Sequence, residues 1–177
     1  MPARPKQCII ALIGPIGSGK TYVARMLARR LGIVHLRTDD IRMRLARRGQ
    51  PISRAIAISD QRREQALSAG RSVILDFDAV RVKKQQELKA LAKHHGARIF
   101  FVQVKAPQQL ILERLRSQRY PIPGVFNSLQ HALLAYFSRR RFHRRKLRCR
   151  QLFVIDNSGA KPLRPQITRI VERIQGR

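Results

Sequence analysis

The sequence predicts an α/β fold in which a five-stranded, mostly parallel sheet is flanked by helices, and two observations carry this prediction. First, short apolar runs alternate with segments of helical periodicity, which is the pattern of a parallel sheet covered on both faces. Second, a glycine-rich loop with a lysine near its end lies between the first apolar run and the first helical segment. The expected strands are residues 8–13, 33–36, 72–77, 99–104 and 151–155.

The glycine-rich loop reads GPIGSGKT and fits G-x-x-x-x-G-K-[ST] at every fixed position. Its glycines let backbone amides approach a phosphate, and the following helix adds a favourable dipole. Lys20 can reach the β- and γ-phosphates of a nucleotide, and the Thr21 hydroxyl can ligate Mg²⁺. The alternative, a turn that precedes Lys-Thr by chance, is disfavoured by the strand and helix on either side. The expected nucleotide-binding residues are Gly14, Gly17, Ser18, Gly19, Lys20 and Thr21.

The composition is that of one globular domain, expected to span residues 1–177, with an ordinary hydrophobic content of 44%. No run of eighteen apolar residues occurs, so no membrane span is expected. The two cysteines suggest no disulfide framework, and a reducing, cytoplasmic location is expected. The 38 basic and 10 acidic residues give a net charge of +28, which attracts polyanions such as nucleic acids. A generally basic surface with no binding function is the alternative.

The few carboxylates gather where the predicted strands end. Five of the ten acidic residues lie at or just beyond such an end: Asp39, Asp40, Asp76, Asp78 and Asp156. Ligands of open α/β sheets bind at that edge. Asp76 lies at the end of the third apolar run, as an acid that holds water on Mg²⁺ would, and Asp78 is expected to contact the substrate from the same side. The alternative is that one of the two only caps the next helix.

Asp39 and Arg42 follow the second expected strand in the segment RTDDIR and are spaced to share one face of a helix. A carboxylate beside a transferred phosphoryl group can accept the proton of an attacking hydroxyl, and a nearby arginine can bind phosphate. Both residues are therefore expected to contact the substrate. The alternative is that Thr38 or Asp39 caps the helix and the charged pair only stabilises it.

A segment rich in arginine and proline is expected to form a lid over residues 116–127. Phosphoryl transfer needs cations on the developing charge and exclusion of water, and a closing loop with arginines supplies both. Arg119 is the expected catalytic arginine and Arg116 the expected nucleotide contact, with a solvated basic loop as the alternative. Asn157, in the loop after the fifth strand, is expected to lie near the adenine.

Two further groups of residues carry expectations about partners and metals. The run Arg139–Arg150 holds eight basic residues among twelve and is the densest candidate for binding nucleic acid, with a solvated helix face as the alternative. His94 and His95 are adjacent but have no companion ligands in the sequence, so no metal site is expected there.

With these motifs the chain resembles the P-loop kinase superfamily, in the branch that contains polynucleotide 5′-hydroxyl kinases, zeta-toxin-like kinases and chloramphenicol phosphotransferases. GPIGSGKT matches the phosphate loop, and RTDDIR is similar to the D-x-x-R element of polynucleotide kinases. SQRYPIPGVFNSLQHALLAYF is similar to the lid and following helix of the bacteriophage-type enzyme. The resemblance implies a P-loop NTPase fold with Asp39 as general base, Arg42 as substrate-phosphate ligand and Arg119 as lid arginine. Asp78 stands where related sequences often carry Asn or Thr.

Three hypotheses of function follow. The first is an ATP- and Mg²⁺-dependent kinase that phosphorylates a hydroxyl. Its favoured acceptor is the 5′-hydroxyl of DNA or RNA. The second is a small-molecule kinase of the same fold that acts on a sugar, antibiotic, nucleoside or nucleotide-sugar. The third is a non-catalytic protein whose binding to nucleic acid is gated by ATP. The Asp39–Arg42 pair argues against the third, because a switch needs no base for an acceptor.

Overall fold

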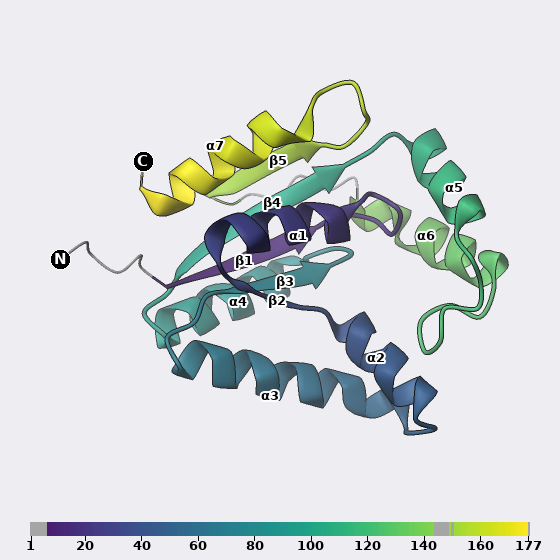
Figure 1. Cartoon of the computed structure of the whole chain (residues 1–177), viewed down its shortest axis with the longest axis horizontal. Coiled ribbons are helices and arrows are strands. Elements are labelled where there is room, and N and C mark those ends of the chain that lie inside the picture. The colour runs from purple at the N-terminus through teal and green to yellow at the C-terminus, as the bar shows by residue number, and fades with distance from the viewer. Residues whose placement is uncertain (1–6, 144–148, 150, 177) are drawn as a thin grey trace.

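A five-stranded parallel sheet runs through the molecule in the order β2-β3-β1-β4-β5 (Figure 1). The computed structural model describes residues 7–143, 149 and 151–176. The strands are β1 (Cys8–Ile13), β2 (Val34–Leu36), β3 (Val73–Phe77), β4 (Arg98–Lys105) and β5 (Leu152–Asp156). All six residues of β1 are buried, since this strand has a neighbour on either side and helices above and below. The predicted α/β class and parallel sheet are confirmed.

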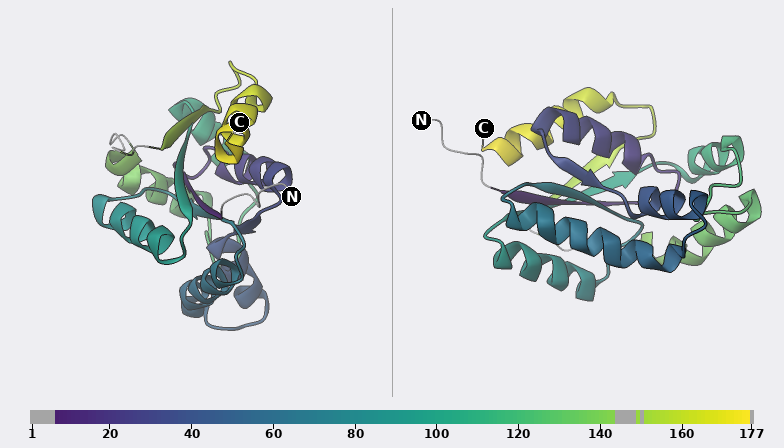
Figure 2. Two further views of the ribbon diagram at one scale, coloured as in Figure 1. Left: turned by 90° about the vertical axis from the view of Figure 1, so that its left-hand side faces the viewer. Right: turned by 60° about the horizontal axis from the view of Figure 1, so that its bottom comes forward.

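Helices cover both faces of this sheet, as the two side views show (Figure 2). They are α1 (Lys20–Leu31), α2 (Thr38–Arg47), α3 (Ala55–Ser68), α4 (Val82–His94), α5 (Gln108–Ser117), α6 (Leu129–His143) and α7 (Leu163–Gln175), with a short 3₁₀ helix η1 (Ile52–Arg54) before α3. Helices α1 and α7 lie on one face, and α3 and α4 lie on the other.

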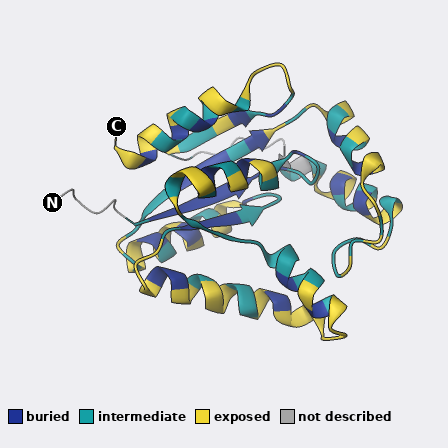
Figure 3. Ribbon diagram, in the orientation of Figure 1, coloured by how far each residue is buried: buried dark blue, intermediate teal, exposed yellow. Residues whose placement is uncertain are grey.

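The core follows from the alternation of side chains along the central strand. Ile10 and Leu12 pack in the layer beneath α1 and α7, whereas Ile9 and Ala11 pack in the layer beneath α3 and α4. Because both faces are covered, the strand reads as a continuous apolar run. In Figure 3 the buried residues lie on the strands and on the sides of the helices that face the sheet.

Helices α2, α5 and α6 lie beyond the carboxyl ends of the strands and border the site. Helices α5 and α6 pack on each other through a cluster that includes Ile111, Leu115 and Tyr136. Helices α2 and α3 share a smaller cluster centred on Ile41. Figure 1 shows α2, α5 and α6 at the end of the sheet where the strand arrows point, and α3 running back from α2 along the sheet. The site is therefore enclosed by these helices above the sheet edge.

The ends of three helices show how they begin and stop. Helix α3 is preceded by η1, and no described side chain caps either of them. Ser128 caps the start of α6, because its Oγ accepts a hydrogen bond from the His131 amide at 3.2 Å. Helix α6 ends at His143 inside the basic run, and residues 144–148 and 150 of that run lie outside the described residues. Over the part of the chain that is described, no helix has both the length and the apolar character to cross a bilayer.

Candidate functional site

The phosphate loop joins β1 to α1 and is held between the ends of two neighbouring strands. The Gly14 amide donates to the Phe77 carbonyl at 3.1 Å, beside the end of β3. On its other side, a Cβ atom on Gly14 would lie only 2.4 Å from the Val104 carbonyl oxygen of β4. Glycine is therefore required here by close approach of the backbone, as the sequence motif implies.

The far side of the loop is supported by Asn157, which follows β5. The Asn157 Nδ2 donates to the Ser18 carbonyl at 2.7 Å, and its backbone amide donates to the Lys105 carbonyl at 2.8 Å. Gly19 adopts a φ of +88°, and a Cβ there would lie 2.1 Å from the same Nδ2. The Asn157 side chain is thus bound to the backbone of the loop, and its expected proximity to an adenine stays a prediction.

Arg114 of α5 makes contacts with the phosphate loop that the sequence did not predict. Its Nη1 donates to the Gly17 carbonyl at 3.1 Å, and its Nη2 donates to the Asn157 carbonyl at 3.2 Å. It therefore links α5, the phosphate loop and the loop after β5. The sequence offers one indication of this placement, which is helical spacing. Arg114 lies three residues after Ile111 and next to Leu115, and both of these residues are buried.

Replacing Arg114 with glutamine is expected to lower the free energy of unfolding by about 1.5 to 3 kcal/mol, because two charge-assisted hydrogen bonds are lost. Thermal and urea denaturation measure this change. The matched control is Arg116→Gln, since Arg116 lies on the same helix and is exposed, and it should change stability by about 0.5 kcal/mol at most. Equal stabilities for the two variants would contradict the role of Arg114 as a link.

Lys20 lies at the centre of a chain of charged contacts. Its Nζ donates to the carbonyls of Gly14 at 2.6 Å and Pro15 at 2.9 Å, and it lies 3.4 Å from the Asp78 Oδ1. The other oxygen of Asp78 accepts a hydrogen bond from Arg139 of α6. Arg139 belongs to the basic run that was predicted to bind polyanions, but the Arg139 side chain reaches into the site. Asp78 therefore joins the loop lysine to α6.

The two carboxylate oxygens of Asp76, near the end of β3, have different surroundings: one lies beside His35 and Arg37, and the other lacks a partner among the described residues. Its Oδ2 lies 3.1 Å from the His35 Nε2 and 3.9 Å from the Arg37 Nε. Its Oδ1 is buried and has no hydrogen-bond partner among the described residues. Such an oxygen fits an acid that accepts a hydrogen bond from a water on Mg²⁺, with Thr21 bordering the same cavity. His35 was missed in the sequence, where a single histidine in a short strand carries no pattern.

Asp39 and Arg42 lie in the first turns of α2 and form an ion pair, with the Arg42 Nη1 2.7 Å from the Asp39 Oδ1. The residue at the N-cap of α2 is Arg37, and no side chain in the described part of the protein caps this helix. The alternative that Thr38 or Asp39 acts as the cap is therefore wrong. The pair instead borders the cavity that contains the phosphate loop.

This cavity has a volume of about 630 Å³ and is bordered by the loop, by β3 and α2, and by α5, α6 and the segment between them. The expected site residues that line it are Gly17, Gly19, Lys20, Thr21, Asp39, Arg42, Asp76 and Asp78. Arg116 and Arg119 are exposed and lie outside this lining, whereas Gln118 and Tyr120 belong to it. The roles expected of the two arginines stay predictions.

The segment expected to act as a lid does lie over α2. A Cβ atom on Gly124 would be 2.8 Å from the Arg42 carbonyl oxygen, so the two backbones touch. The Tyr120 hydroxyl donates to the Leu115 carbonyl at 3.1 Å, and burial raises the pKa of this phenol. Tyr120 therefore stays protonated and ties the segment to α5 at neutral pH.

A second, smaller cavity of about 310 Å³ borders Gly14 and Pro15 of the loop and shares Asp78 with the first. Its lining includes the cationic residues Arg81, Lys105 and Arg140. Asp78 therefore stands between two cavities at the carboxyl edge of the sheet.

The sheet order, the phosphate loop and the acid at the end of β3 define a P-loop kinase-like fold. A family model described as an AAA domain, AAA_33, matches residues 9–141, and the chain belongs to this family. The UPF0200 protein of Aeropyrum pernix is 33% identical over 132 residues, which are 66% of this chain and 68% of that protein.

Two solved kinase structures share the fold. A sugar kinase from Janibacter sp. is 17% identical, with a TM-score of 0.60 over 93% of this chain and 92% of that chain. A gluconokinase from Sinorhizobium meliloti is 17% identical, with a TM-score of 0.54 over 98% of this chain and 91% of that chain. The P-loop kinase-like architecture expected from the sequence is thus confirmed.

Proposed function

We propose that the protein is a phosphotransferase that moves the γ-phosphate of ATP to a hydroxyl group of an acceptor. The observation that carries the proposal is the presence of Asp39 and Arg42 in one cavity with Lys20 and Thr21. A protein that only binds nucleotide has no need of a carboxylate and an arginine on the acceptor side of the phosphate loop.

The residues divide into a donor side and an acceptor side. The loop amides and Lys20 bind the nucleotide phosphates, and Thr21 and Asp76 are the residues that would hold Mg²⁺, whose charge neutralises the β- and γ-phosphates. On the acceptor side, Asp39 takes the proton of the acceptor hydroxyl while the hydroxyl oxygen forms a bond to the γ-phosphorus. The bond from that phosphorus to the bridging oxygen breaks, and ADP leaves with the electron pair. Arg42 offsets the negative charge on the transferred group.

We favour a small-molecule acceptor. The cavity of about 630 Å³ has the size of a small-molecule site, and the lid segment lies in backbone contact with α2 beside Arg42. The wall of the cavity also carries apolar side chains suited to a compact ligand: Met43, Ile56, Ile122, Val125 and Phe126. The similarity of the fold to a sugar kinase and a gluconokinase supports the same acceptor class.

The 5′-hydroxyl of DNA or RNA is the second candidate acceptor. The net charge of +28 favours it, because that charge would hold a polyanion near the site. Arg139, which starts the basic run, borders the cavity and pairs with Asp78. A nucleic-acid strand bound at Arg139 would therefore lie beside the phosphate loop.

Transfer of labelled γ-phosphate from ATP to a panel of acceptors tests the proposal, with Lys20→Ala as the blank. The panel contains sugars, nucleosides, an aminoalcohol antibiotic, and 5′-hydroxyl DNA and RNA oligonucleotides. We expect label on one of the small acceptors. Any label on the oligonucleotides should not increase with their length. Label on oligonucleotides alone would establish the second candidate. ATP-dependent oligonucleotide binding without transfer would instead indicate a non-catalytic protein.

A further inference from the structure

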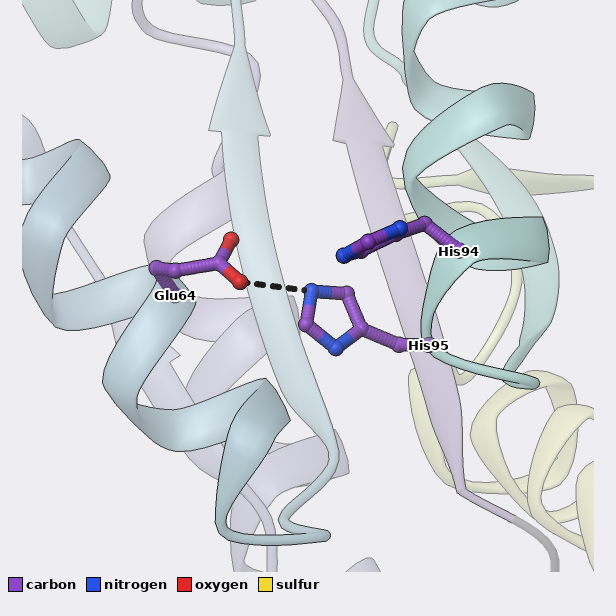
Figure 4. Close-up of side chains that lie close together, drawn as sticks. All are labelled: Glu64, His94 and His95. Atoms are coloured by element: carbon purple, nitrogen blue, oxygen red, sulfur yellow. Dashed lines mark ion pairs between the residues drawn. The ribbon is translucent and has the colours of Figure 1, made fainter.

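We propose that Glu64, His94 and His95 form a binding site for a divalent transition metal such as Zn²⁺, far from the phosphate loop. Each residue offers one ligand atom, and these three atoms lie within 4.8 Å of one another. Figure 4 shows Glu64 on α3 facing the two histidines at the end of α4. The expectation that the histidine pair lacks a companion ligand is therefore wrong, because the fold brings in a residue from thirty positions earlier in the chain.

The end of α4 explains how two adjacent histidines reach one point. Consecutive side chains of a continuing helix diverge by about 100° and cannot readily share a ligand. His94 is the last residue of α4, and His95 is its C-cap with φ −92° and ψ 7°. The two rings stand 4.8 Å apart between centroids at an angle of 86°. Both rings thus lie close together at the end of α4, on the side of Glu64.

The burial of His95 is the second observation that points to a ligand. Its side chain is 8% exposed, and its Nε2 is buried without a properly oriented hydrogen bond from the described residues. The Glu64 Oε1 nevertheless lies 3.0 Å from that nitrogen. Two ligands at about 2.0 Å from a tetrahedral zinc ion are about 3.3 Å apart. The nitrogen and oxygen are thus already near the spacing that a shared ion imposes.

The donor set selects the class of metal. Two imidazole nitrogens and one carboxylate oxygen suit Zn²⁺ and similar transition ions, whereas Mg²⁺ and Ca²⁺ prefer oxygen ligands. Three protein ligands leave a fourth position for water. Glu64 also supplies a negative charge in a strongly basic chain, and the neighbouring Arg63 is paired with Asp60 at 2.6 Å.

The position of the site suggests a structural role for the ion. A metal held by Glu64 and the two histidines would join α3 to α4 near the amino ends of the strands (Figure 1). Helix α3 also packs against α2 through Ala55 and Ile41. The ion would therefore fix the helix on which α2, with its Asp39–Arg42 pair, rests.

Isothermal titration of the full chain with ZnCl₂, in excess Mg²⁺ to suppress binding at Asp76, tests the proposal. We expect one Zn²⁺ per chain, with the dissociation constant raised about tenfold or more in both His94→Asn and Glu64→Gln. Both residues are exposed, so these variants should fold, which circular dichroism checks. The matched control is His131→Asn on exposed surface of α6, which should leave the constant within about twofold.

Co²⁺ provides a spectroscopic check, because tetrahedral coordination gives visible absorption that should appear on titration and be lost in both variants. Two outcomes would overturn the proposal. One is the absence of a Zn²⁺ site in the wild-type chain, which would leave Glu64 and His95 as an ion pair only. The other is unchanged Zn²⁺ affinity in His94→Asn and Glu64→Gln, which would place the ion elsewhere.

Discussion

Replacing Asp39 with asparagine is expected to lower kcat for phosphoryl transfer by about 10²- to 10⁴-fold, because the acceptor hydroxyl loses its general base. Nucleotide affinity should stay within about twofold of wild type, since Asp39 lies on the acceptor side of the cavity and the donor side is unchanged. The ion pair with Arg42 is also lost. Asp39 is 44% exposed, so this costs the fold about 1 kcal/mol or less. Steady-state kinetics and calorimetry with a non-hydrolysable ATP analogue separate the two effects.

Asp40→Asn is the control for this experiment. Asp40 is the next residue on α2, pairs with Arg37 at 2.8 Å and lies outside the described lining of the cavity. Its replacement removes the same charge from the same helical turn and should leave kcat within about threefold of wild type. A near-normal kcat in Asp39→Asn would remove Asp39 from the role of base. An equal loss in both variants would assign the effect to the charge of the helix.

Replacing Gly19 with alanine is expected to abolish nucleotide binding and to lower the free energy of unfolding by about 2 to 5 kcal/mol. Two costs add together. The φ of +88° disfavours any L side chain, and the new Cβ would stand 2.1 Å from the Asn157 Nδ2. Relief of that clash requires Asn157 to release the Ser18 carbonyl, which distorts the phosphate loop. Urea denaturation and analogue binding measure the two consequences.

Gly159→Ala is the control variant that separates the cost of the positive φ from the cost of the clash with Asn157. Gly159 has a φ of +90°, but no atom of the described residues lies within 4 Å of the position that a Cβ would take, so Gly159→Ala carries the conformational cost alone. This control should lose about 1 to 2 kcal/mol and keep its affinity for nucleotide. Similar losses of stability in the two variants would show that contact with Asn157 contributes little to the shape of the loop.

The fold and the phosphate loop could be predicted because their determinants are local in the sequence. The apolar runs of β1 and β4 need only their own residues and a covered sheet, and the loop motif needs only its flanking strand and helix. The Asp39–Arg42 pair is also local, since a spacing of three residues on a helix brings two side chains together.

The remaining parts of the site depend on how distant elements pack, which the sequence pattern does not specify. Three arginines lie near the end of α5, and only the rotation of that helix decides that Arg114 reaches the loop. Arg139 approaches Asp78 because α6 folds back over the sheet edge. Likewise, Glu64 meets the histidine pair only after α3 and α4 are placed side by side on the sheet.

The contacts of Asn157 mean that the phosphate loop takes its shape only when β5 and the loop that follows it are in place. The motif lies near the start of the sequence, yet its support comes from residues that follow β5 and from Arg114 of α5. A nascent or refolding chain therefore has the residues of the loop before it has their arrangement. Affinity for nucleotide would then appear only once β5 has joined the sheet, which makes that affinity a reporter of the docking of this strand.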